Sequence, residues 1–96
     1  MFDLTGKSAL ITGASGGIGS AIARALHARG AQGVLHGTRA EKLESLRAEL
    51  GNGAHVLTAN LSDREAVSSM ISSAADMAGS VDILVNNAGI TRDNLF

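Results

Sequence analysis

Residues 8–19, SALITGASGGIG, decide the fold of this chain. The apolar segment Ser8 to Ile11 predicts a buried strand, and the glycine-rich run after it predicts a tight turn into a helix. Gly13, Gly17 and Gly19 leave the backbone free to turn, to approach an anion closely and to let the helix pack near the strand. Because the amides of the first helical turn face such an anion, we expect a phosphate-binding turn here.

The rest of the chain alternates short apolar runs with helical patterns, which is typical of β-α units on a parallel sheet. The pattern predicts strands at 8–12, 33–37, 55–59 and 82–86, with a helix after each of the first three. The doubly wound arrangement gives these strands the order 3-2-1-4, with the binding crevice between strands 1 and 4. We therefore expect an α/β fold, a Rossmann-type doubly wound parallel sheet of about four strands and three helices, with the fourth strand as an exposed edge.

Apolar stripes predict which face of each helix is buried. The predicted stripes are Ile18, Ala21, Ile22, Ala25 and Leu26 in the first helix, Leu43, Leu46 and Leu50 in the second, and Val67, Met70, Ile71, Ala74 and Ala78 in the third. Capping boxes at 38–41 and 62–65 predict the starts of the second and third helices. The fourth strand is apolar enough to be buried on both faces.

Composition narrows the possible partners. A net charge of -1 and a pI near 6.2 give no basic stripe for a nucleic-acid backbone or an acidic membrane surface. No stretch approaches the ~18 apolar residues of a membrane span, and the start of the chain has no signal-peptide pattern. The sequence has no cysteine, which fits a reducing compartment. We therefore expect a cytoplasmic protein without nucleic-acid or membrane partners.

The titratable residues do not converge on a metal site. His27, His36 and His55 lie at spacings that bring them to no common point, so none is expected as a ligand or catalyst. The charged residues of the second helix predict a solvated face, and Met70 and Met77 predict packing. The charges concerned are Glu41, Lys42, Glu44, Arg47 and Glu49.

Two motifs together identify a family resemblance. Thr12 to Gly19 and Asn86-Asn87-Ala88-Gly89 resemble the T-G-x-x-x-G-x-G and N-N-A-G hallmarks of the short-chain dehydrogenase/reductases. The stretch 86–96 resembles that of bacterial 3-oxoacyl-[acyl-carrier-protein] reductases, and acetoacetyl-CoA reductases are similar there. The resemblance covers all 96 residues. It implies NADPH-dependent reduction of a β-keto acyl thioester, carried on acyl carrier protein, to the β-hydroxy form in fatty acid biosynthesis by a homotetramer.

The resemblance also assigns cofactor contacts. It implies that the glycine turn holds the pyrophosphate, that Asn60 and Leu61 contact adenine, and that Asn87 both ties strand backbones together and contacts a ribose. The implied cofactor-binding residues are Gly13, Ser15, Gly16, Gly17, Ile18, Gly19, Thr38, Arg39, Asn60, Leu61, Asn87, Ala88, Gly89 and Ile90. The alternatives are a turn without a ligand and, at Asn60, an ordinary strand-end turn.

The end of the second strand bears on the choice between NAD and NADP. NAD enzymes place a carboxylate there, whereas this chain has Gly37-Thr38-Arg39. Arg39 can bind a 2'-phosphate bidentately, which favours NADP(H). Because position 16 is glycine, such a clamp depends on Arg39, Thr38 and Ser15. The alternative is that Thr38 caps the next helix and Arg39 is a solvated charge.

The family's catalytic Asn, Ser, Tyr and Lys come later in its domain, and this chain contains none of them. It has no Tyr at all, and Lys7 and Lys42 lie in the wrong segments. We therefore expect no catalytic residue here, and residues 1–96 to be the amino-terminal part of one dinucleotide-binding domain. The alternatives are an acetoacetyl-CoA reductase or another short-chain dehydrogenase, and a non-catalytic nucleotide-binding fragment that pairs its fourth strand with a partner.

Overall fold

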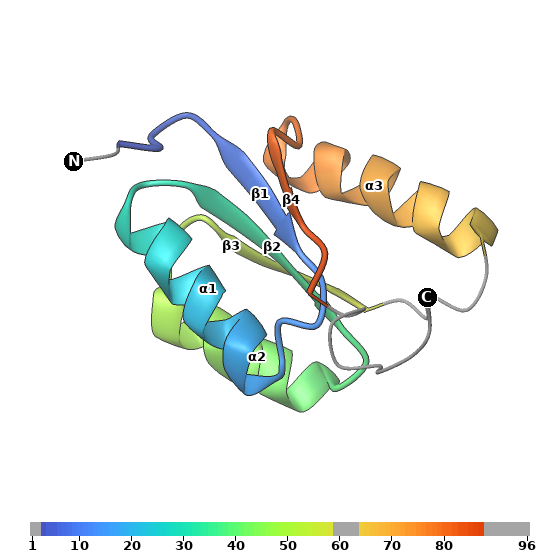
Figure 1. Cartoon of the computed structure of the whole chain (residues 1–96), viewed down its shortest axis with the longest axis horizontal. Coiled ribbons are helices and arrows are strands. Elements are labelled where there is room, and N and C mark those ends of the chain that lie inside the picture. Colours follow the sequence, from blue (N-terminus) through green and yellow to red (C-terminus); the bar gives the residue numbers. More distant parts are fainter. Residues whose placement is uncertain (1–2, 59–63, 88–96) are drawn as a thin grey trace.

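The computed structural model of the chain describes residues 3–58 and 64–87, in which strands and helices alternate (Figure 1). The elements are β1 (Ser8–Ile11), α1 (Gly17–Ala28), β2 (Gln32–Gly37), α2 (Ala40–Leu50), β3 (Ala54–Thr58), α3 (Arg64–Ala78) and β4 (Ile83–Val85). Every predicted strand and helix is present, and the described strand ends lie within about one residue of the prediction. None of the described helices has the length and hydropathy needed to cross a membrane.

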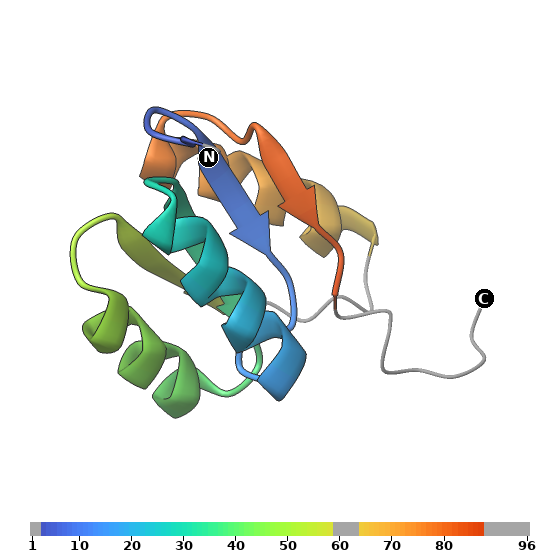
Figure 2. The ribbon, with the colours of Figure 1, turned by 60° about the vertical axis from the view of Figure 1, so that its left-hand side comes forward.

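All strand pairs are parallel, and the sheet has the predicted order β3-β2-β1-β4. Leu10 in β1 lies between Val34 in β2 and Leu84 in β4. Since β2 and β3 extend the sheet on one side of β1 and β4 lies on the other, the order reverses between β1 and β4 (Figure 2). The carboxyl ends of these two strands therefore meet at the switch point where such sheets bind ligands.

Helices cover both faces of the sheet. α1 and α2 lie on one face, where Leu43 of α2 packs with Ile11 and Leu35 of the sheet (Figure 1). α3 lies on the other face, over Leu10 and Val34. Neighbouring residues of one strand point to opposite faces, so β1 supplies both cores and is buried along its whole length. This central position fixes the turn that follows β1.

The buried face of α1 differs from the predicted stripe. Gly19 and Ala23 are buried and Ile22 and Leu26 are half-buried, whereas Ala21 and Ala25 are exposed and Ile18 is 59% exposed. Gly19 explains the difference, because its missing side chain lets the helix approach the carbonyl of Gly13. Small residues thus face the sheet, and the helix is rotated by about one residue relative to the prediction.

The start of α2 also corrects a prediction. The residue that precedes the helix as its N-cap is Arg39, and no side chain caps the first turn. The capping box predicted at 38–41 is therefore wrong, since Thr38 lies one residue too early to act as the cap. The second predicted box, at 62–65, begins outside the described residues.

The remaining differences concern exposed apolar side chains. Met70 and Ala74 of α3 are buried as predicted, but Ile71 and Met77 are 40% and 41% exposed. The side chain of Val67 lies outside the described part. Leu84 is 53% exposed, so the prediction that β4 is buried on both faces is wrong. Its outer edge pairs with no strand in the described ranges, as expected for an edge.

Candidate nucleotide-binding site

Main-chain hydrogen bonds hold the turn after β1 between its neighbours. The N–H of Thr12 donates to the carbonyl of Val85 at the end of β4 (3.0 Å), and the N–H of Ala14 donates to the carbonyl of His36 in β2 (2.8 Å). Gly13 stands between them with a φ of 66°, a conformation that glycine adopts without strain. The turn is therefore fixed by backbone contacts directly at the switch point.

The start of α1 leaves room for an anion. Gly16 precedes the helix in an extended conformation, and no side chain caps the first turn, so its leading amides have no side-chain acceptor. A Cβ at Gly17 would meet nothing within 4 Å, which means that the space before these amides is open. Ile18 is exposed beside them. This end of the helix fits a pyrophosphate.

Gly19 closes the back of the turn. A Cβ at this position would overlap the carbonyl oxygen of Gly13 and lie 2.8 Å from Nδ2 of Asn87. Real Cβ atoms do not approach other atoms this closely, so a side chain at position 19 requires a shift of α1 or of the turn. The glycine is thus required by the packing of the site.

Asn87 follows β4 and is 3% exposed. Its Nδ2 donates to the carbonyl of Gly13 (3.1 Å), which confirms that this side chain ties the two strand ends together. Its Oδ1 is buried and accepts no hydrogen bond from the residues that the structure describes. A buried acceptor left unpaired costs about 1–3 kcal/mol, so the open Oδ1 indicates a place where a bound molecule supplies the donor.

The residues predicted to clamp a 2'-phosphate lie near the end of β2. A Cβ at Gly37 would lie 3.2 Å from the hydroxyl oxygen of Ser15, so glycine at this position lets Ser15 lie against the strand end. Thr38 and Arg39 follow directly and are both exposed. The structure thus brings Ser15, Thr38 and Arg39 to the carboxyl end of β2.

Several predicted contacts lie outside the described residues. These are Asn60, Leu61, Ala88, Gly89 and Ile90. Two of the histidines have clear partners, because Nε2 of His27 hydrogen-bonds the carbonyl of Asn52 (2.8 Å) and Nε2 of His55 hydrogen-bonds Oε1 of Gln32 (3.2 Å). Within 3–58 and 64–87, no group of His, Asp and Glu residues is arranged to hold a metal ion.

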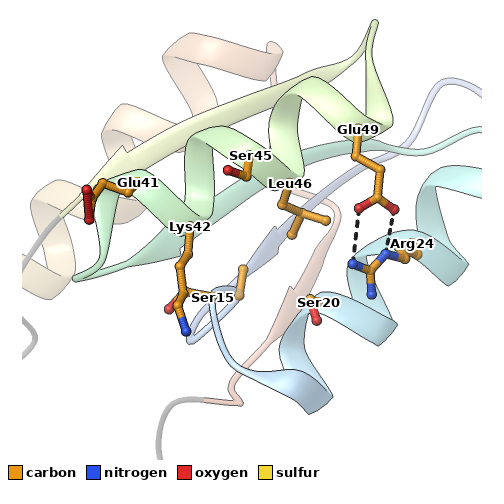
Figure 3. Close-up of a pocket in the computed structure, with 9 residues that line it drawn as sticks. Ser15, Ser20, Arg24, Glu41, Lys42, Ser45, Leu46 and Glu49 are labelled. Carbon is orange, nitrogen blue, oxygen red and sulfur yellow. Dashed lines mark hydrogen bonds and ion pairs between the residues drawn. The ribbon is translucent and has the colours of Figure 1, made fainter.

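A pocket of about 390 Å³ lies between α1 and α2 beside the turn (Figure 3). It is lined by Ala14, Ser15, Ser20, Arg24, Glu41, Lys42, Ser45, Leu46 and Glu49. Arg24 and Glu49 face each other in a two-bonded ion pair, with Nε–Oε2 and Nη2–Oε1 distances of 2.6 and 3.1 Å. This hydrogen bonding, together with the guanidinium charge, lowers the pKa of Glu49.

This pocket was not predicted from the sequence, because Lys42 and the other charged residues of α2 were expected to form a solvated face. Spacing in the sequence did not predict the pocket, because the pocket depends on how α1 and α2 lie against each other.

The parallel sheet, the glycine turn at its switch point and the uncapped helix start define the class of nucleotide-binding α/β proteins. The chain belongs to the short-chain dehydrogenase family, whose pattern residues 7–96 match.

Relatives with curated names are similar over almost the entire chain. Nodulation protein G of Rhizobium sp. (strain N33) is 64% identical over 97 residues, which cover 100% of this chain and 39% of that protein. The 3-oxoacyl-[acyl-carrier-protein] reductase FabG of Rickettsia conorii is 50% identical over 95 residues, which cover 99% of this chain and 38% of that protein. The chain thus spans well under half the length of these relatives.

Solved structures agree with the fold. A short chain dehydrogenase from Mycobacterium smegmatis has a TM-score of 0.82 and 32% identity, over 91% of this chain and 39% of that one. A 3-ketoacyl-(acyl-carrier-protein) reductase from Brucella melitensis, complexed with NADH, has a TM-score of 0.80 and 34% identity, over 85% of this chain and 34% of that one.

Proposed function

We propose that residues 1–96 form the amino-terminal, cofactor-binding part of a single dinucleotide-binding domain, and that the whole protein is an NADPH-dependent 3-oxoacyl-[acyl-carrier-protein] reductase. The observation that carries cofactor binding is the buried, unpaired Oδ1 of Asn87 beside the glycine turn. An acceptor in this place, next to uncapped helix amides, matches a ligand that has both hydroxyl donors and phosphate oxygens.

The residues of this chain bind and orient the cofactor. The amides of Gly17 and Ile18 receive the pyrophosphate, and Oδ1 of Asn87 accepts a ribose hydroxyl. Asn60 and Leu61 contact adenine, and Ala88, Gly89 and Ile90 form the wall beside the nicotinamide. When bound, the reduced nicotinamide supplies a hydride, and this chain's contribution to the reaction is to position its donor.

The preference for NADP(H) depends on the end of β2. Arg39 is exposed two residues after Gly37, the position that Ser15 lies against, and no carboxylate stands between Gly37 and Arg39 to repel a 2'-phosphate. A guanidinium binds such a phosphate through two parallel hydrogen bonds. We therefore assign the 2'-phosphate to the carboxyl end of β2.

Similarity to the named reductases supports the substrate class, a β-keto acyl thioester on acyl carrier protein. The catalytic Ser, Tyr and Lys that this reaction uses in the family are supplied by a part of the protein beyond this chain, so the 96 residues alone bind cofactor without turnover. From the family resemblance of the two motifs, we also propose that the whole protein is a cytoplasmic homotetramer; the net charge of -1 gives no support for a nucleic-acid or membrane partner.

The test is NADPH oxidation by the whole protein with an acetoacetyl thioester, offered on acyl carrier protein and on coenzyme A. Turnover that is faster with the carrier-protein thioester supports the proposal. Turnover only with the coenzyme A thioester indicates an acetoacetyl-CoA reductase, and no oxidation with either overturns the substrate class. In parallel, the 96-residue chain should bind NADPH in a titration and show no turnover.

A further inference from the structure

The pocket between α1 and α2 opens beside the glycine turn. Ala14 and Ser15 line one side of it, and Lys42 and Ser45 of α2 line the other. In Figure 3, the side chain of Lys42 extends from α2 toward Ser15, and Glu41, which also lines the pocket, lies at the start of α2. The ammonium group of Lys42 and the hydroxyl of Ser15 thus share one space.

Two cations and two carboxylates line this pocket. Arg24 and Glu49 pair with each other through two hydrogen bonds, and the other two charges are Lys42 and Glu41. Lys42 forms no ion pair with any residue in the described ranges, Glu41 included. Its ammonium group and the hydroxyl of Ser15 are therefore both available as donors to an anion with several oxygen atoms.

The position of the pocket specifies that anion. Ser15 lies against the end of β2, and Arg39 is one helical turn before Lys42 at the uncapped start of α2. Position 16 is glycine, so the turn itself brings no cation to this place. A phosphate monoester held at Ser15 would thus face Lys42 in the first turn of α2, with Arg39 as the residue that precedes the helix.

We propose that Lys42 binds the 2'-phosphate of NADP(H) together with Arg39 and Ser15 and is a determinant of the preference for NADPH over NADH. This inference rests on the proposed function, because it requires a cofactor that carries a 2'-phosphate.

The test measures binding by the whole protein of two fragments that differ only in this phosphate, adenosine 2',5'-bisphosphate and adenosine 5'-monophosphate. Calorimetry should show that Lys42→Gln weakens the bisphosphate about five- to tenfold and the monophosphate less than about twofold. Lys42→Arg keeps the charge and should stay within about threefold of the parent protein. The matched control, Lys7→Gln, removes the same charge before β1, at the opposite end of the sheet, and should leave both affinities unchanged.

The outcomes separate the two proposals. A parent protein that binds both fragments equally lacks a 2'-phosphate site, which overturns the NADP(H) assignment and this inference with it. A parent protein that prefers the bisphosphate while Lys42→Gln keeps the full preference overturns only the role of Lys42. Equal weakening by Lys7→Gln also overturns it, since the effect would then be one of net charge.

Discussion

Polar side chains connect β1 to β4 at both ends of the strand pair, and Asp82 and Asn87 make a direct comparison. At the amino end, Oδ2 of Asp82 accepts hydrogen bonds from the N–H of Ser8 (2.9 Å) and the hydroxyl of Ser80 (3.1 Å). The N–H of Asp82 in turn donates to the carbonyl of Ser8 (2.8 Å). At the carboxyl end, Asn87 donates to Gly13 and leaves its Oδ1 buried and unpaired.

Both ends thus link β1 to β4 through a side chain, but they differ in whether the acceptor atoms of that side chain have hydrogen-bond partners. At the amino end, the carboxylate of Asp82 has its hydrogen-bond partners within the chain, and Asp82 itself is exposed. This is typical of a structural connection. The carboxyl end keeps an acceptor open beside a glycine turn and a helix start, at a cost to stability that a ligand can offset. Hydrogen-bond satisfaction, rather than residue type, therefore separates a strand connection from a candidate binding site in this molecule.

The largest effect is expected from filling the space behind the turn. Gly19→Ala places a Cβ against the carbonyl of Gly13, and should lower the free energy of unfolding by about 3 kcal/mol and the affinity for NADPH at least about 100-fold. Urea unfolding and fluorescence titration measure both. Gly17→Ala is the control for folding, since its Cβ meets nothing, and should keep or slightly raise stability. Equal stability of the two variants would contradict the described packing.

Removing Asn87 and Asp82 in turn tests whether the two ends of the strand pair differ in function. Asn87→Ala deletes the open acceptor and the bond to Gly13, and should weaken NADPH binding about tenfold with a loss of about 1 kcal/mol in unfolding free energy. Asp82→Ala should lower stability but change the affinity for NADPH less than about twofold. Titrations of both variants under the same conditions provide the measurement. A similar loss of affinity in the two would mean that the ends do not differ in function.

Only the amino end should respond to acid. The hydrogen bond from the N–H of Ser8, with smaller contributions from Ser80 and Lys7, lowers the pKa of Asp82. The stability that Asp82 contributes is therefore complete above its unfolded pKa of about 3.9 and is lost as the pH falls through the lower folded value.

Urea midpoints of the parent protein and Asp82→Asn should accordingly differ near pH 6 and converge toward about pH 3. Asn87 carries no titratable group, so the gap between the parent protein and Asn87→Ala should stay constant over this range. A constant gap for Asp82→Asn would show that its carboxylate contributes nothing as a charge.

The smallest effect is expected away from both ends, at the ion pair between α1 and α2. The side chains of Arg24 and Glu49 are 50% and 51% exposed, so water and salt screen their attraction. Glu49→Gln should shift the thermal midpoint by about 2 °C or less, and the shift should vanish in about 1 M salt. Calorimetry checks this, and a larger shift that persists in salt would mean that the pair holds the helices in place.

Much of the fold could be predicted because alternation, glycine stops and the handedness of crossovers leave few arrangements of four parallel strands. The face of α1 could not, since the stripe rule favours large residues such as Ile18. The helix instead turns Gly19 and Ala23 to the sheet, because close approach to the turn selects small side chains. The sequence predicts the fourth strand at the edge of the sheet and, from its apolar run, burial on both faces. The exposure of Leu84 shows that such a run does not by itself mean burial at an edge.

The site was predictable to the extent that it is local in sequence. The glycine turn and the bond from Asn87 to Gly13 follow from the two motifs. The pocket that contains Lys42 does not, because it depends on how α1 and α2 lie against each other, and helical spacing alone assigns that lysine to solvent. The unpaired Oδ1 of Asn87 is also a property of three-dimensional surroundings that no motif encodes.

The turn after β1 takes its shape from bonds made by main-chain atoms of Thr12 and Ala14 to the two adjoining strands. Such bonds do not depend on which side chains stand at positions 15, 38, 39 and 42. Shape and selectivity are consequently separable properties of this molecule. On the proposed function, a protein engineer could change which nucleotide is preferred by exchanging those four side chains, while the turn keeps its geometry.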